Sequence, residues 1–424
     1  MKKIIIFSLV LLSISIQYIH AQVDTTINKQ QLTLDQFLYL VSQNNLEYAA
    51  EKYNVNISEA AIELAKVFPN PYISFDWNEF RTGQSRTGYG FIPELGTSLE
   101  LGGKRKARVD LADSQKELTQ ALLDDYFRNL RAEAAIIYLE AMQQDQLYKV
   151  KNNLYQTMRK LSEADSIRLF LGNIMETNAI QSKLEAGMLL NELLQKEADR
   201  RNSFSHLNLM AGMTNKDTLL YPVDTLHKVK RHFDLNNLIL VAEQNRADLE
   251  AARYDKIVSS KATTLAKKER IMDLDLKIYN ENEFAVPDIG VYAWTINAGI
   301  AIPLQFSNHY KGDLKMAQFA EQQSEKRFSF VQLNIRIEIT EAYQNYIFAE
   351  KQVENFQINL LNQSEKVLKG KIYSYQRGET SLLEVLNAQR TSNEIQTTYI
   401  ETLFNYYGAL VELEKTAGIW DISF

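Results

Sequence analysis

The chain has 424 residues, no cysteine and a formal net charge of −6. Without cysteine it cannot form disulfides, thiolate metal sites or a cysteine nucleophile, and its negative charge offers no surface for nucleic acid. The five histidines are scattered, with no spacing typical of a metal site. No catalytic constellation is visible, so we expect no enzyme, no cofactor and no metal centre.

Residues 1–21 have the pattern of a signal peptide. Lys2 and Lys3 precede an apolar run at 4–16, and Ala21 is a small residue at a plausible cleavage point. The run is too short to span a bilayer, and no later stretch has 18 consecutive apolar residues. We therefore expect export from the cytosol and no membrane-spanning helix.

The segment 104–171 contains neither Gly nor Pro and is rich in Ala, Leu, Glu, Gln, Lys and Arg. This composition predicts one continuous helix of roughly 100 Å. Leu147, Leu154 and Leu161 recur every seven residues, which is typical of a coiled coil and not of a solvated, charge-rich helix.

The chain aligns with itself, which indicates an internal duplication. Gln43 and Asn44 fall on Gln244 and Asn245, and later in the chain Gly172 falls on Gly378. We expect a first repeat at 33–213, a linker at 214–233 and a second repeat at 234–418. The predicted long helices are 104–171 and 173–211 in the first repeat, then 311–377 and 379–417 in the second.

Four segments alternate apolar and polar residues, as half-buried strands do: 71–79, 95–101, 273–280 and 293–302. The segments 80–94 and 280–292 are expected to be loops. A small soluble sheet would show the same alternation, but helices of this length provide no globular core for its apolar face. We therefore expect barrel strands in a membrane, and several protomers must share one barrel because four strands cannot close.

Two motifs carry a resemblance to a known family. The first leaves the second strand and the other follows the second predicted hairpin tip: Leu99-Glu100-Leu101-Gly102-Gly103-Lys104-Arg105, and Gly378-Glu379-Thr380-Ser381-Leu382-Leu383-Glu384-Val385-Leu386-Asn387-Ala388-Gln389. With these motifs the chain resembles the TolC-like outer-membrane efflux proteins over residues 32–419. The first motif is most similar to the heavy-metal-efflux subgroup.

The resemblance implies a mostly α-helical homotrimer with a twelve-stranded transmembrane barrel and a periplasmic α-helical tunnel. It implies the outer membrane of a Gram-negative cell, with lipid, a periplasmic adaptor protein and an inner-membrane transporter of the RND type as partners. The expected function is the exit duct of a tripartite efflux system for small molecules or metal ions. A duct for protein secretion and a periplasmic coiled-coil scaffold without a pore are the alternatives, and the exported substrate stays open.

The resemblance also assigns roles to the two hairpin tips. Gly172 and Gly378 are expected to end helices in a left-handed conformation, at the periplasmic entrance where the adaptor docks. The family's gate has a Tyr three residues before the second Gly, which Tyr375 matches. Thr380 and Asn178 stand where the family has an Arg and an Asp, so we expect its salt bridge to be absent here.

The motif with two glycines marks a second place of interest. Gly102 and Gly103 lack the further glycines of a phosphate-binding loop, so we interpret them as a strand-to-helix turn. Lys104 and Arg105 follow at once and would lie near the headgroup boundary, where cations meet anionic lipid.

Overall fold

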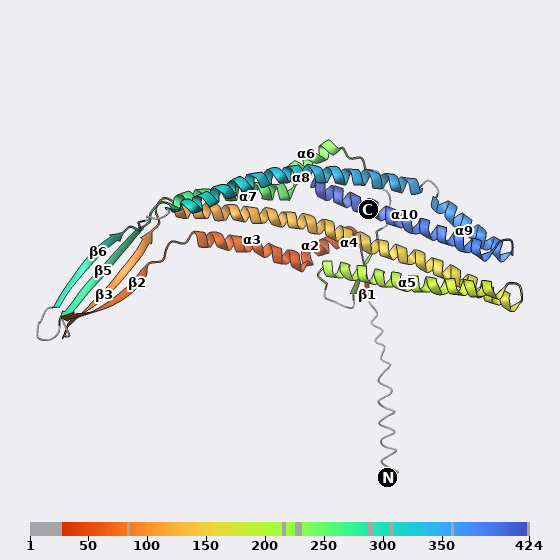
Figure 1. Ribbon diagram of the computed structural model, residues 1–424, viewed down its shortest axis with the longest axis horizontal. Helices are drawn as coiled ribbons and strands as arrows, with labels where there is room; N and C mark the ends of the chain where they lie inside the picture. Colours follow the sequence, from red (N-terminus) through yellow and green to blue (C-terminus); the bar gives the residue numbers. More distant parts are fainter. Residues whose placement is uncertain are drawn as a thin grey trace, which may run out of the picture.

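The protein is described by a computed structural model that covers residues 28–82, 85–213, 218–224, 231–285, 292–304, 309–357 and 360–421. The predicted signal peptide lies outside the described residues, as do 214–217 and 225–230 of the predicted linker. The molecule is elongated, with a small sheet at one end and a long shaft of helices (Figure 1). Two helical hairpins form the other end of the shaft.

Helices make up most of the described chain, as the sequence predicts. They are α2 (Leu34–Asn44), α3 (Leu46–Ala65), α4 (Lys104–Phe170), α5 (Glu176–Met210), α6 (Leu235–Asn245), α7 (Ala247–Glu269), α8 (Lys311–Gln357), α9 (Leu360–Gln376) and α10 (Leu382–Ala417). The strands are β1 (Asn28–Leu32), β2 (Tyr72–Thr82), β3 (Ser85–Leu99), β4 (Thr218–Pro222), β5 (Leu274–Ala285) and β6 (Tyr292–Ala301). Two shorter helices, two strands and a long helix follow one another in both halves, while the duplication itself stays a prediction.

Three of the predicted strands, β2, β3 and β5, are longer than the alternation predicted, whereas β6 has the predicted length. β3 begins at Ser85, inside the expected loop, and pairs with β2 on one side and β5 on the other. Gly88, Gly90 and Pro93 lower the intrinsic strand preference of this segment, but pairing with two neighbours overrides it. β3 also stops before Glu100 and Leu101, which were expected to belong to it.

The sequence did not predict the sheet at the middle of the shaft. β1 and β4 pair in parallel, with Leu32 opposite Pro222. β4 lies inside the segment that we expected to be only a linker. Five-residue strands give too short a pattern to recognise in the sequence alone.

α4 is the spine of the molecule. It runs uninterrupted for 67 residues because it contains no helix breaker, and it contacts α3, α5, α7 and α10. Small residues line its buried side, among them Ala134, Ala135 and Ala141, and their size lets neighbouring helices approach closely. Figure 1 shows α3 and α5 arranged along α4 one after the other, so that α4 bridges both.

The main hydrophobic core surrounds the β1–β4 pair. Phe37, Tyr138, Tyr346 and Tyr406 are among its largest fully buried side chains. The Tyr138 hydroxyl lies 2.6 Å from a carboxylate oxygen of Asp224, which also accepts the backbone N–H of Leu34 at 2.7 Å. This core therefore joins the start of the first half to the segment that follows α5.

The sheet at the far end has the order β2-β3-β5-β6, and all its neighbouring strands are antiparallel. One of its faces is apolar and exposed, with Ile73, Phe75, Trp77, Ile278, Trp294, Ile296 and Ile300. β2 and β6 each leave one edge unpaired within the described residues. No described helix has the length and apolar character needed to cross a membrane.

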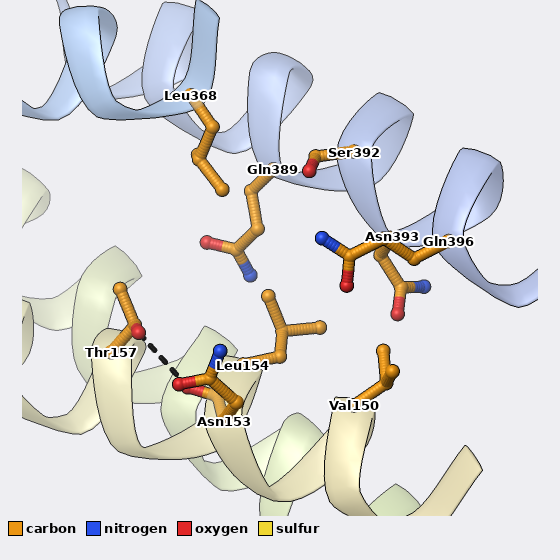
Figure 2. A pocket seen from close by; sticks show the side chains of 9 residues that line it. All are labelled: Val150, Asn153, Leu154, Thr157, Leu368, Gln389, Ser392, Asn393 and Gln396. Carbon is orange, nitrogen blue, oxygen red and sulfur yellow. Dashed lines mark hydrogen bonds between the residues drawn. The ribbon is translucent and has the colours of Figure 1, made fainter. Parts of the chain in front are cut away.

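A polar cavity of about 50 Å³ lies between α4 and the α9–α10 hairpin (Figure 2). Its polar side chains come from α4 and α10: Asn153, Thr157, Gln389, Ser392, Asn393 and Gln396. Ser392 Oγ and Asn393 Oδ1 are buried and have no hydrogen-bond partner in the part of the chain that the structure describes. A cavity of this size with several polar groups has room for one or two water molecules, which would satisfy them.

Two serines, one at the N-terminal cap of α10 and one in this cavity, should respond differently to substitution. Ser381 caps the helix, because its Oγ accepts the Glu384 N–H at 3.4 Å, so Ser381→Ala should lower the free energy of unfolding by about 1 kcal/mol. Ser392→Ala should change it by less than about 0.5 kcal/mol, since no protein group is lost. Thermal unfolding in detergent measures both, and equal losses would show that Ser392 Oγ is held by a partner.

Candidate functional site

The two hairpin tips lie at the end of the molecule opposite the sheet (Figure 1). Gly172 ends the α4 side of the first tip with φ +73°, and Gly378 ends the α9 side of the second with φ +78°. A Cβ at either glycine would meet nothing within 4 Å. The backbone conformation, and not lack of space, therefore requires glycine at both turns.

A polar cluster joins the two hairpins just behind the tips. The Tyr375 hydroxyl of α9 lies 3.1 Å from both carboxylate oxygens of Asp165 in α4. The Arg168 guanidinium lies 3.5 Å from the same carboxylate and 5.0 Å from the Tyr375 ring centre. Asp165 is fully buried and Tyr375 is 3% exposed, so this contact is shielded from water.

Apolar residues surround the cluster. Met158 and Leu161 of α4 and Leu382, Val385 and Leu386 of α10 form one buried group with Tyr375. Burial and the nearby Asp165 charge raise the pKa of Tyr375 to about 12, so its hydroxyl keeps its proton at neutral pH. The hydroxyl can therefore donate to Asp165, and this hydrogen bond holds the α9–α10 hairpin against α4.

The structure places the three predicted gate residues near the tips and adds a partner for one of them, while their role as a gate stays a prediction. Asn178 lies in the first turn of α5, and Thr380 directly precedes the cap of α10; both are half-buried. The carboxylate that meets Tyr375 comes instead from Asp165, before the first glycine and not after it. Sequence reasoning missed Asp165 and Arg168 because the contact joins residues 210 positions apart.

The first tip carries a patch of exposed apolar side chains. Ile167, Phe170, Leu171 and Met175 are all exposed, with Phe170 at 90%. The second tip is more polar, with Arg377 and Glu379 3.9 Å apart. An apolar patch at a protruding turn is typical of a contact surface for another protein.

The predicted boundary turn lies between β3 and α4. Gly102 and Gly103 both have φ +73°. A Cβ at Gly102 would come within 2.3 Å of the Ile271 side chain, so close packing also requires glycine there.

The cations after this turn serve the fold. Lys104 is 4% exposed, and its Nζ donates to Asp273 at 2.7 Å. Asp273 also accepts the Leu101 N–H at 3.1 Å. Lys104 is therefore an internal ion-pair partner, and the position of this turn at the headgroup boundary stays a prediction.

Arg105 and Arg108 tie the same junction together. Arg105 Nε donates to the Lys66 carbonyl at 2.6 Å, and its guanidinium lies 4.0 Å from the Phe68 ring centre. Arg108 binds both oxygens of Glu100, at 2.6 and 2.9 Å, and this bond lowers the pKa of Glu100. These contacts fasten the sheet to the helical shaft.

No group of three or more His, Cys, Asp or Glu side chains is placed to hold a metal ion in the part of the chain that the structure describes. The tips and the junction thus offer contact surfaces and a hydrogen-bonded lock.

Comparisons with known proteins agree with this architecture. The family model for outer membrane efflux proteins matches residues 238–419. The cobalt-zinc-cadmium resistance protein CzcC of Cupriavidus metallidurans is 22% identical over 397 residues, which cover 91% of this chain and 90% of CzcC.

Solved structures share the fold over nearly the whole length. The Campylobacter jejuni CmeC outer membrane channel has a TM-score of 0.75 at 14% identity, covering 91% of this chain and 85% of CmeC. The open state of the Neisseria gonorrhoeae MtrE outer membrane channel has a TM-score of 0.71 at 14% identity, covering 91% and 89%. The resemblance predicted from the sequence is thus confirmed: the chain is similar to the outer membrane efflux proteins in sequence over its second half, and the solved structures show the same fold.

Proposed function

We propose that this protein is the outer-membrane channel of a tripartite efflux system, assembled as a homotrimer. The observation that carries the proposal is the four-stranded sheet: within the described residues its apolar face is exposed and its two outer edges are unpaired. Open edges are not tolerated in hydrocarbon, so three copies would join edge to edge into twelve strands. Lipid would then cover the apolar face, and the polar face would line the lumen.

The helical shaft supports the same assembly. Exposed apolar residues lie on α3 and on α8, among them Tyr53, Ile57 and Leu64 of α3 and Phe319 of α8. Such stripes on one protomer are suited to burial against the next copy around a threefold axis. The resulting tunnel of helices would extend from the barrel into the periplasm of a Gram-negative cell.

The partners follow from the two ends. The apolar patch around Phe170 supports docking of a periplasmic adaptor at the tips, which would couple the duct to an inner-membrane transporter of the RND type. The name of CzcC supports divalent metal cations as the exported substrate. A protein-secretion duct would use the same assembly, whereas a scaffold without a pore leaves the apolar sheet face uncovered.

Two measurements test the proposal together. In detergent, the native mass should be three times that of the mature protomer, and in planar bilayers the purified protein should conduct ions. A stable monomer that forms no pores would overturn it.

Substitutions at two positions of β6 that lie on opposite faces should distinguish the two faces of the sheet. Ile300→Asp places a charge against hydrocarbon and should cost up to about 2–4 kcal/mol near the bilayer midplane, which would reduce assembled trimer. Asn297→Asp adds the same charge on the polar face and should leave assembly intact. The amount of trimer in outer-membrane extracts measures the effect, and normal assembly of both variants would contradict the assignment of faces.

The lock behind the tips should hold the duct closed. Tyr375→Phe removes the hydroxyl that donates to the buried Asp165 carboxylate, a loss of about 1–3 kcal/mol. We expect the α9–α10 hairpin to separate more often from α4, which should raise the open fraction and the mean conductance. Tyr373→Phe is the matched control, because Tyr373 is exposed two residues away. Equal conductance of the two variants would show that this contact does not restrain the tips.

A further inference from the structure

One row of residues crosses the polar face of the sheet. The register aligns Tyr72 of β2 with Gly96 of β3, Gly96 with Lys277 of β5, and Lys277 with Gly299 of β6. Two long side chains thus alternate with two glycines.

The glycines let these side chains lie flat on the sheet. A Cβ at Gly96 would come within 2.3 Å of the Tyr72 ring, and one at Gly299 within 3.0 Å of Lys277 Cγ. The Tyr72 ring and the Lys277 chain therefore occupy the space above the glycines. Neither side chain needs to project away from the sheet.

Glu94 of β3 connects the two. The Tyr72 hydroxyl donates to Glu94 Oε1 at 3.0 Å, and Lys277 Nζ donates to Oε2 at 3.2 Å. The Glu94 side chain is 15% exposed and that of Lys277 40% exposed, so the carboxylate lies under the ammonium group. Both oxygens of Glu94 are engaged, and the pair has no net charge.

Lys277 has a special position in the charge pattern of this face. Among the residues that the register places with it, from Tyr72 to Asn78, Gly90 to Ser98, Asp275 to Glu283 and Ala293 to Ala301, it is the single cation. The other charged residues there are carboxylates: Asp76, Asp275, Glu281 and Glu283. Apart from the Glu94–Lys277 pair, the face is therefore negative.

We propose that Glu94 is a specificity-determining residue of the duct: it holds Lys277 against the sheet and cancels its charge, so that the barrel admits cations. The inference rests on the proposed function, because it takes the polar face as the lumen of a trimeric barrel. Three copies would place three such pairs at one level of the barrel. Releasing the three ammonium groups there would oppose the passage of cations.

The expected size of the effect follows from Coulomb's law. A unit charge about 10 Å from an ion in water changes the local ion concentration by about twofold, and three charges at one level act together. Salt screens this interaction over about 10 Å at 0.1 M, so the measurement belongs at or below that ionic strength.

The test is the reversal potential of single channels of the full-length trimer in planar bilayers under a KCl gradient. Glu94→Gln leaves Lys277 unbalanced and should lower the ratio of potassium to chloride permeability by about twofold or more. Lys277→Met leaves Glu94 unbalanced and should raise the ratio. The double variant Glu94→Gln/Lys277→Met restores a neutral pair and should return to the wild-type ratio.

The outcomes separate the inference from the proposed function. A wild type that forms no pores would overturn the proposed function and the inference with it. Wild-type pores whose selectivity stays unchanged in both single variants, or shifts in the same direction in both, would overturn the inference alone. Tyr72→Phe keeps every charge and should leave the ratio unchanged, so a shift in this variant would also contradict a role based on charge.

Discussion

The rest of the structure depends on one constraint: a sheet whose apolar face no part of the described chain covers. A protomer with Phe75, Trp77 and Trp294 exposed on one face cannot be a stable end state in water. In the proposed assembly, lipid would cover this face, and strands of further copies would pair with the edges of β2 and β6 that are free within the described residues. The position of the sheet determines where the shaft and the tips lie, because α4 begins directly after Gly103 and connects the sheet to the tips.

Buried charges fasten the elements of the shaft to one another. Lys104 and Asp273 join the start of α4 to the approach of β5, and Arg246 plays a similar part at mid-shaft. Arg246 is buried and binds Asp248 at 2.6 Å, Glu338 of α8 at 2.8 Å and the Thr416 carbonyl of α10 at 3.1 Å. Burial alone would raise the pKa of Asp248, but the hydrogen bond and charge of Arg246 lower it. Each buried cation thus has its partners on different elements, which fixes their relative positions.

Long, regular patterns in the sequence predict most of the long helices and the four alternating strands, but the segment predicted as one helix over 311–377 is described as two elements, α8 and α9. Absence of breakers over 104–171 anticipates α4 almost to the residue, since it ends at Phe170. The β1–β4 pair could not be predicted, because five-residue strands leave little periodic signal and their pairing joins segments 190 residues apart. The turn glycines at both tips, Gly172 and Gly378, could be predicted because glycine is the residue that most readily adopts the left-handed backbone found there.

The polar contacts of the candidate site were less accessible from the sequence. Tyr375 was recognised through a resemblance, but its partner Asp165 depends on how two hairpins pack. The burial of Lys104 could not be predicted, because nothing in the sequence distinguishes a buried lysine next to a turn from an exposed one. The Glu94–Lys277 pair required the strand register, and no pattern along the chain reveals which strands are neighbours.

The arrangement of α3 and α5 along α4 restricts how such a chain can change in length. An insertion of one residue within α4 would advance its far end by 1.5 Å and rotate it by 100°, which would displace one tip relative to the barrel. The same insertion at mid-shaft, in the segments beside the β1–β4 pair that precede α2 or follow α5, would leave the register of α4 intact. In related sequences, insertions and deletions should therefore accumulate at mid-shaft. The helix that corresponds to α4 should keep its length while its sequence diverges.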